Sequence, residues 1–142
     1  MKINFGLIGF SDISERIMID EIISNPKCSI KKIASKTKTV SKQVLKKTNA
    51  IECKDYLDVI NDKNIDAIYI SIPTGIRFRW TKLSLQAKKH VLIEKPATMN
   101  LFESRQITKL AMKNKLILKE NFMFLHHKQH KFVKKIIDNH DI

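Results

Sequence analysis

Glycine, proline and cysteine are scarce in this chain, whose 142 residues include three glycines, three prolines and two cysteines. So little glycine and proline excludes collagen-like and low-complexity sequence. Cys28 and Cys53 are far apart and make no metal-binding or redox motif, which is typical of a reducing compartment. No apolar stretch approaches the ~20 residues that a membrane-spanning helix needs. We therefore predict a cytoplasmic protein with one core.

Acidic residues are scarce relative to basic ones. The chain has 27 Lys and Arg against 14 Asp and Glu, a formal net charge of +13. This excess favours anionic ligands such as phosphates, and non-specific contact with nucleic acid or anionic lipid. The lysines are spread along the chain without aromatic residues between them. We therefore interpret them as solvated faces and predict no specific nucleic-acid or membrane partner.

Apolar strand patterns alternate with helical ones along the whole chain. The patterns predict strands at 3–8, 29–35, 66–73, 91–93 and 116–121, and helices at 13–24, 40–48, 56–61, 76–89, 101–113 and 131–139. Alternating strands and helices are typical of a parallel sheet with helices on both faces. We expect the α/β class: a doubly wound, Rossmann-like parallel sheet in three α/β/α layers.

The sequence Glu94-Lys95-Pro96 follows directly after the apolar strand at 91–93. Pro96 cannot continue the hydrogen-bond ladder, so the strand stops with Lys95 at its carboxyl end. The preceding strand also ends in a proline, Pro73, and a strand–helix–strand unit of this length places both ends at one edge. Ligands bind at that edge in open α/β sheets. The alternative is an ordinary strand end with a surface ion pair.

The turn after the first strand occupies the place of a dinucleotide-binding G-x-G-x-x-G motif. Residues 9–14 read Gly-Phe-Ser-Asp-Ile-Ser, so only the first glycine, Gly9, is present. Ser11 is a good N-cap for the helix that follows, and Asp12 suits the helix dipole. By itself this motif is weak, because serine carries a Cβ where the motif needs close backbone approach.

Several segments, in order, resemble the N-terminal NAD(P)-binding domain of the Gfo/Idh/MocA oxidoreductases. They are residues 6–9, 56–57 with 66–73, 89–96 and 120–124, and Glu94-Lys95-Pro96 is the most specific. The resemblance implies a Rossmann domain at 1–125, followed by a crossover segment and C-terminal helix at 126–142. The second, substrate-binding domain of that family would be absent from these residues. Thr74 and Arg77 stand where the family often has asparagine and histidine. Trp80 follows at helical spacing, and we predict that it is a core residue rather than a stacking platform.

The resemblance also implies a function and a set of site residues. Family members transfer hydride between a nicotinamide cofactor and a hydroxyl or carbonyl of a sugar, inositol or related polyol, and Lys95 would be the catalytic residue. The expected cofactor contacts are Gly9, Phe10, Ser11, Ile13, Ser35, Lys36, Ile72, Pro73, Thr74, Arg77, Glu94 and Lys95. The resemblance leaves open whether this chain catalyses the reaction by itself. The alternative is a non-catalytic nucleotide-binding or interaction module with a degenerate cofactor site.

The end of the second strand bears on the choice between NADP and NAD. An acidic residue there would bind the ribose 2′-hydroxyl of NAD, whereas this chain has Ser35 and Lys36. A hydroxyl followed by a cation suits a 2′-phosphate, so we expect NADP rather than NAD. The alternative is that Lys36 is one more exposed lysine. Asp12 would place an anion beside the pyrophosphate and weaken its binding.

Two further expectations concern partners and metals. Residues 122–125 form an apolar run, Phe-Met-Phe-Leu, which would favour a homo-oligomer or a complex with a chain carrying the missing domain. His126 and His130 lie four residues apart, with His127 between them, and on a helix the two could share a metal. Because no clear carboxylate or thiolate partner lies nearby, we predict no metal site.

Overall fold

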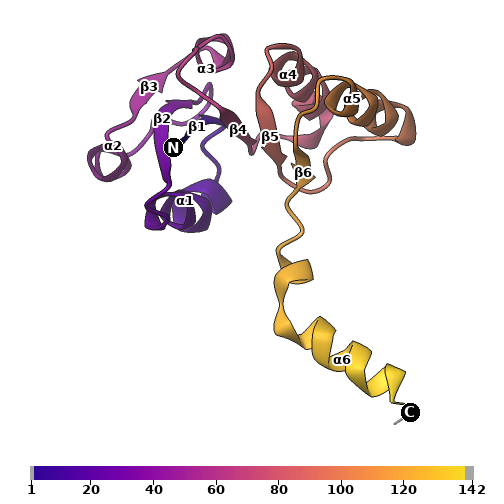
Figure 1. Cartoon of the computed structure of the whole chain (residues 1–142). Coiled ribbons are helices and arrows are strands. Elements are labelled where there is room, and N and C mark those ends of the chain that lie inside the picture. The colour runs from indigo at the N-terminus through magenta and orange to yellow at the C-terminus, as the bar shows by residue number, and fades with distance from the viewer. Residues whose placement is uncertain (1, 140–142) are drawn as a thin grey trace.

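The computed structural model describes residues 2–139 and contains one six-stranded sheet. All the paired strands run parallel, in the order β3-β2-β1-β4-β5-β6 (Figure 1). The strands are β1 (Ile3–Ile8), β2 (Cys28–Ala34), β3 (Ile51–Cys53), β4 (Ala67–Ile70), β5 (His90–Ile93) and β6 (Leu118–Glu120). The predicted doubly wound, Rossmann-like α/β fold is confirmed.

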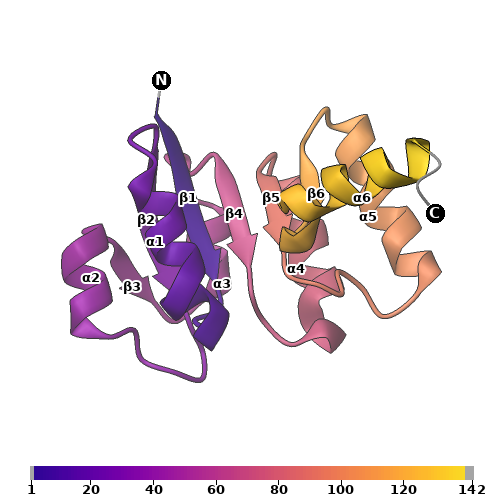
Figure 2. The same cartoon turned by 90° about the horizontal axis from the view of Figure 1, so that it is seen from below.

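The helices form two groups, one for each face of the sheet (Figures 1 and 2). The π-helical segment η1 (Ser14–Met18), α1 (Ile19–Ser24) and α2 (Lys42–Thr48) contribute to one core cluster. The helices α3 (Tyr56–Ile60), α4 (Thr74–Gln86) and α5 (Leu101–Lys113) contribute to the other. A 3₁₀ turn, η2 (Met123–His126), and helix α6 (Lys128–Asp138) follow β6.

Side chains of the central strands alternate between the two clusters. On β1, Leu7 belongs to the cluster with α1 and Ile8 to the cluster with α4. On β4, Tyr69 lies on the first side, while Ile68 and Ile70 lie on the second. All of them are fully buried, as expected for parallel strands covered on both faces. These two strands therefore anchor the sheet, and their carboxyl ends are held in fixed positions.

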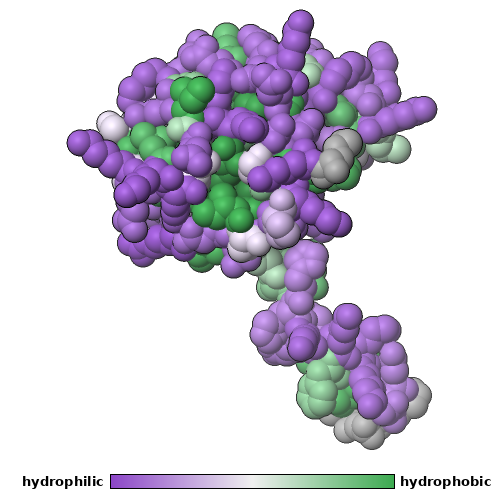
Figure 3. All heavy atoms as spheres, turned by 60° about the vertical axis from the view of Figure 1, so that its left-hand side comes forward, coloured by the Kyte–Doolittle hydropathy of each residue, from purple (hydrophilic) through white to green (hydrophobic). Residues whose placement is uncertain are grey.

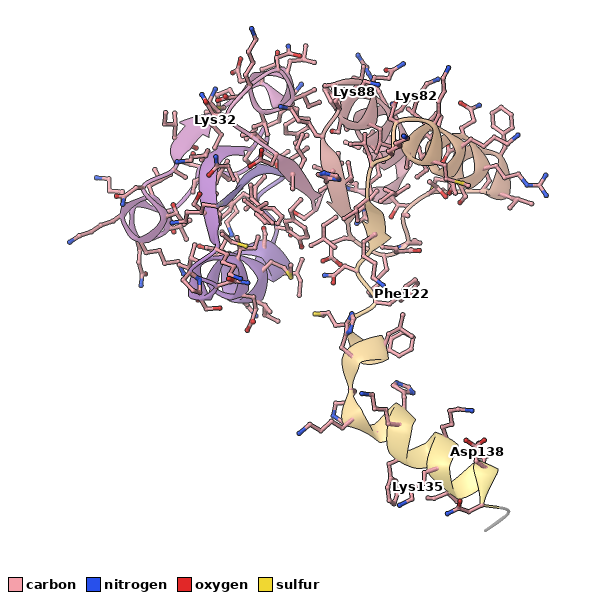
Figure 4. All side chains as sticks on the ribbon, viewed as in Figure 1. Lys32, Lys82, Lys88, Phe122, Lys135 and Asp138 are labelled. Carbon is pink, nitrogen blue, oxygen red and sulfur yellow. The ribbon has the colours of Figure 1, made fainter. Side chains whose placement is uncertain are left out.

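Beyond β4, the face that carries α1 is only partly covered. Leu92 is half-buried there, and an apolar cavity of about 400 Å³ opens among residues that include Phe5, Val91 and Ile117. Figure 3 shows apolar side chains gathered on one face of the molecule and along the projecting C-terminal part, within an otherwise hydrophilic surface. Most lysines contribute to that hydrophilic surface, as Lys82 and Lys88 do where they point away from the sheet (Figure 4), whereas Lys89 is buried.

Most predicted boundaries differ from the observed ones by one to three residues, and three of the differences have a clear physical cause. Strand β3 was missed, because it has only three residues at a sheet edge and shows no apolar alternation. Helix α6 begins at Lys128, three residues before the predicted start, because the Nδ1 of His127 accepts a hydrogen bond from the Gln129 amide (3.2 Å) and caps it. The first helix contains the π segment, which the periodicity could not reveal.

Helix α6 projects away from the sheet (Figure 1), beyond Phe122, which lies at the exit from β6 (Figure 4). Its apolar side chains Phe132, Val133 and Ile137 are 64%, 41% and 53% exposed. The predicted division into 1–125 and 126–142 stays a prediction. Among residues 2–139, every helix is too short or too polar to traverse a lipid bilayer.

Gly6 provides a test of how β1 packs. A Cβ at this position would lie only 2.3 Å from Val59 Cγ1 and 2.8 Å from Ile65 Cδ1. Because both neighbours are buried, Gly6→Ala is expected to lower the free energy of unfolding by about 1–3 kcal/mol through overpacking. Urea unfolding measures the change. Gly75→Ala is the matched control, since nothing lies within 4 Å of its Cβ position; an equal loss in both variants would contradict this packing.

Candidate functional site

A cavity of about 400 Å³ opens at the carboxyl edge of β1, β2 and β4. Its lining comes from the turn after β1, the loop after β2, the start of α3, the β4–α4 turn and helix α4. The lining residues are Gly9, Phe10, Ser11, Ser35, Lys36, Thr37, Tyr56, Ser71, Ile72, Pro73, Ile76 and Trp80. The volume falls in the range of small-molecule sites. The structure thus brings together Gly9, Phe10, Ser11, Ser35, Lys36, Ile72 and Pro73 of the predicted cofactor contacts.

Gly9 shapes the floor of this cavity. Its φ of 96° lies in the region that favours glycine. Its amide donates to the Ala34 carbonyl (2.8 Å). A Cβ would meet Ile72 Cγ2 at 2.8 Å and the Ser71 carbonyl oxygen at 2.9 Å. Only glycine therefore lets the first turn approach the end of β4 this closely.

Two serines replace the second and third glycines of the motif. Ser11 is the N-cap, as predicted, because its Oγ accepts from the Ser14 amide (3.3 Å). Ser14 is fully buried, and its Oγ donates to the Ser11 carbonyl (2.7 Å). The buried hydroxyl is therefore satisfied within the turn, which explains how a serine fits the position where close packing usually requires glycine.

Asp12 points toward a lysine of the neighbouring loop. Lys38 Nζ lies 3.5 Å from Asp12 Oδ1 and 2.7 Å from Glu15 Oε2. The hydrogen bond to Glu15 raises the pKa of Lys38 above its ordinary value. The two ion pairs connect the first turn to the loop after β2. The negative charge that was expected to oppose a pyrophosphate is therefore partly offset by a neighbouring cation.

Lys36 lies over two aromatic rings of the cavity wall. Its Nζ is 5.1 Å from the centroid of Tyr56 and 5.4 Å from that of Trp80. The two rings pack edge to face, with centroids 4.9 Å apart. Cation–π attraction thus holds the ammonium at the cavity. Lys36 is exposed, and it also lines the cavity.

The aromatic pair shows what the sequence could and could not indicate. Trp80 was predicted to be a core residue, and it is 8% exposed and belongs to the core cluster on the α4 side. Its role in lining the cavity was missed, as was that of Tyr56. Helical spacing had indicated which face Trp80 occupies, but not that the face meets the loop after β2.

Lys95 lies where the sequence placed it, at the carboxyl end of β5. Ile93 of β5 pairs with Ile70 of the neighbouring parallel strand β4, so Pro73 and Lys95 share one edge, as predicted. The side chain of Lys95 is exposed, whereas that of Glu94 is buried. The structure therefore presents the Lys95 ammonium at the edge of the sheet, and the buried side chain of the adjacent Glu94 anchors the segment that carries it.

Two of the expected cofactor contacts, Glu94 and Arg77, have buried side chains. Glu94 is 6% exposed, and its Oε1 accepts from the Tyr69 hydroxyl and from Asn121 Nδ2, both at 2.7 Å. Arg77 is 8% exposed and donates to three backbone carbonyls. Burial lowers the pKa of Arg77, and burial with the Glu94 hydrogen bond raises that of Tyr69. Both side chains thus support the sheet edge from inside, because the first turn of α4 directs Arg77 inward. Their cofactor contacts stay predictions.

Three other predicted contacts, Ile13, Thr74 and Lys95, lie outside the cavity lining. Ile13 packs against the core cluster on the α1 side, and Thr74 begins α4. Within residues 2–139, no group of three or more His, Cys, Asp or Glu side chains could hold a metal ion. Of His126, His127 and His130, the one at position 127 acts as the cap of α6.

Comparison with known proteins identifies the family. Residues 3–122 match the model of the GFO_IDH_MocA family, described as "Oxidoreductase family, NAD-binding Rossmann fold". The chain belongs to this family. It carries the NAD-binding Rossmann fold of these oxidoreductases, which is consistent with the cavity at the sheet edge.

Curated relatives of the chain include sugar-modifying reductases. The chain is 32% identical over 136 residues to dTDP-3,4-didehydro-2,6-dideoxy-alpha-D-glucose 3-reductase from Actinomadura kijaniata, which covers 96% of this chain and 41% of that protein. It is 35% identical over 65 residues to D-xylose 1-dehydrogenase (NADP(+)) from Hypocrea jecorina, covering 46% of this chain and 17% of that protein. The chain therefore spans about two fifths of the length of its reductase relatives.

A solved structure shows the same arrangement. The crystal structure of KijD10, a 3-ketoreductase from Actinomadura kijaniata in complex with NADP and TDP-benzene, superposes with a TM-score of 0.91 at 31% identity. The match covers 98% of this chain and 43% of that one. The fold of this family member thus extends over nearly all of the residues here.

Proposed function

We propose that this chain is an NADP(H)-binding domain that serves the reduction of a carbonyl, or the reverse oxidation, on a nucleotide-linked sugar. The observation that carries the proposal is the position of Lys36. Its ammonium lies at the cavity, over Tyr56 and Trp80, and no acidic residue lines the cavity. A cation at this place suits a 2′-phosphate, and an acid would suit an unphosphorylated ribose.

The residues present fit a dinucleotide. Gly9 allows close approach of the backbone, and the amides at the start of the helix beyond Ser11 suit a pyrophosphate. The Tyr56–Trp80 pair provides an apolar wall for the adenosine part. When bound, the nicotinamide supplies or accepts the hydride. The protein binds and orients the cofactor and provides the acid–base group.

Lys95 is proposed as that acid–base group. In the reducing direction, hydride reaches the carbonyl carbon while the Lys95 ammonium gives a proton to the carbonyl oxygen, which becomes a hydroxyl. The reverse direction returns the proton to the lysine amine. Glu94, Tyr69 and Asn121 take no proton in this scheme; they anchor the segment that carries Lys95.

The proposed substrate class rests on the relatives and on charge. Two of the relatives above act, by name, on a dTDP-linked keto sugar and on xylose. The formal net charge of +13 favours a substrate with a diphosphate over a free sugar. We therefore place a nucleotide-linked sugar first and a free sugar or polyol second.

The alternative of a non-catalytic module keeps one observation in its favour. The first turn has lost two glycines and carries the acidic Asp12 beside the proposed pyrophosphate position. Absence of nicotinamide binding would favour this alternative, and saturable binding would support the proposed cofactor site.

Trp80 makes that measurement possible. It is the single tryptophan of the chain and lines the cavity. We expect NADPH to quench its fluorescence in a saturable way, with energy transfer to the nicotinamide, and to bind more tightly than NADH. Absence of any saturable change with either nucleotide would favour the non-catalytic module.

The apolar side chains after β6 support a proposed interaction surface. Met123, Phe124 and Leu125 are 46%, 56% and 53% exposed. A contiguous exposed apolar patch favours association. We propose a homo-oligomer or a complex with a chain that provides the substrate-binding part, and the mass in solution at high concentration tests it.

Charge at Asp12 should affect cofactor affinity. Because Asp12 lies at the helix start beside the proposed pyrophosphate, Asp12→Arg is expected to tighten NADPH binding by up to about tenfold at low salt. The gain should shrink at high salt, where exposed charges are screened. The measurement is the Kd from the Trp80 signal at two ionic strengths. Unchanged affinity at low ionic strength would show that Asp12 serves only the helix start and Lys38.

A further inference from the structure

Arg77 is an arginine whose side chain is committed to backbone oxygens around Lys95. It lies in the first turn of α4 and is 8% exposed. Its Nε donates to the Ile72 carbonyl at 2.5 Å. Its Nη1 donates to the carbonyls of Glu94 (2.8 Å) and Pro96 (2.6 Å), the residues on either side of Lys95. One planar guanidinium thus connects two segments of the sheet edge.

The first of these segments is the wall of the cofactor cavity. Ile72 and Pro73 line the cavity on the β4 side. The second segment carries Lys95 beyond β5. Since β4 and β5 are neighbours, the guanidinium spans the gap between the cavity wall and the peptide that holds the lysine.

Other hydrogen bonds fix the same peptide from its remaining sides. The Glu94 amide donates to the Ile70 carbonyl (3.0 Å). The Ala97 amide donates to Glu120 Oε1 (2.8 Å). The side chain of Lys95 is nevertheless exposed. A reactive group on a rigid, buried support is the arrangement that preorganises a functional site.

We infer that Arg77 is a positioning residue, which fixes the Lys95 ammonium against the nicotinamide end of the cofactor cavity. The inference rests on the proposed function, because Lys95 must face bound NADP(H). Lysine at position 77 would keep the charge but has one nitrogen, which cannot reproduce the planar fork that reaches three carbonyls. Arg77→Lys should therefore leave binding intact and change where Lys95 lies.

The test is competitive labelling of lysine amines by reductive methylation, with each lysine quantified by mass spectrometry. At NADPH concentrations of about ten times the Kd, roughly one tenth of the sites stay empty, so labelling of Lys95 in the native chain should slow about tenfold. Exposed Lys131 on α6 is the internal reference. The Kd comes from the Trp80 signal in every variant.

In Arg77→Lys we expect the protection of Lys95 to fall below about twofold at the same occupancy, with a Kd within about threefold of the native value. Arg77→Gln, which removes the charge, should show the same loss of Lys95 protection. The control is Arg105→Gln: Arg105 is exposed on α5, and this variant should keep the full protection of Lys95. If a substitution only loosened the fold, it would weaken NADPH binding and the protection of Lys95 together, and the Kd would show this.

Full Lys95 protection in both Arg77 variants would overturn the positioning role. Native chain that binds NADPH without protecting Lys95 would overturn it too, because the lysine would then lie away from the nicotinamide. A native chain that binds no NADPH at all would instead refute the proposed function, and the fluorescence titration distinguishes that outcome. Should Arg77→Lys fail to fold, Arg77→Gln decides, and loss of folding in both would count against a role beyond the fold.

Discussion

Lys36→Asp is expected to reverse the preference for NADPH over NADH. In the native chain the ammonium lies at the cavity, held over Tyr56 and Trp80, where it can pair with a 2′-phosphate. A hydrogen bond to a charged group contributes ~1.5–3 kcal/mol, so its loss should weaken NADPH binding about ten- to hundredfold. An aspartate at this place accepts hydrogen bonds from the ribose hydroxyls, which should tighten NADH binding.

The control for this substitution is Lys113→Asp. Lys113 is exposed in the last turn of α5, and the change alters the net charge of the chain by the same amount. It should leave the ratio of the two affinities unchanged. If NADPH and NADH bind equally well before and after Lys36→Asp, the 2′-phosphate is not recognised by this residue.

The second large effect is the rate of hydride transfer by these 142 residues alone. We expect turnover well below ~1 s⁻¹, the low end of ordinary enzymes, with NADPH and dTDP-linked keto sugars or a panel of sugars and polyols. Lys95 is exposed and the cofactor cavity is open, so water is not excluded. Orientation of a substrate can contribute ~7–11 kcal/mol to lowering a barrier, and the described residues leave the substrate side unconfined.

A steady-state assay of NADPH oxidation measures this rate, and Lys95→Ala is its partner variant. Turnover of ~1 s⁻¹ or more that Lys95→Ala abolishes would show that these residues suffice for catalysis. Turnover that Lys95→Ala leaves unchanged would remove the acid–base role of Lys95.

The sheet could be predicted because its central strands are short apolar runs that end abruptly. Pro73 and Pro96 each follow the last residue of their strand, β4 or β5, by three residues. Because neither can continue a strand, the placement of Lys95 at the edge followed from local rules. Strand β3 was not foreseen, because Glu52 interrupts its three residues and sheet pairing alone defines it. Long-range pairing of this kind leaves no periodic signal in the sequence.

The sequence predicted correctly the site residues that depend on backbone geometry. It predicted less well the residues whose role depends on the direction of a long side chain. Gly9 and Ser11 lie in a turn whose geometry the motif dictates, and both line the cavity. Arg77 and Glu94 were placed at the correct edge, but their side chains turn inward to buried partners. Sequence spacing does not state which way a long side chain turns at a helix start. The Trp80 contact with Lys36 joins residues far apart in the chain, and it too left no local signal.

Mapping the bound cofactor by backbone NMR tests the central claim, that the cavity at the carboxyl edge of β1, β2 and β4 is a nicotinamide dinucleotide site. On titration with NADP⁺, the account predicts saturable amide shift changes in the turn after β1, in the loop around Lys36 and at Ser71 and Ile72. The amides around the apolar cavity near Phe5 and Ile117, toward the amino ends of the strands, should remain unchanged. Shift changes confined to that second cavity, or none at saturating NADP⁺, would contradict the account.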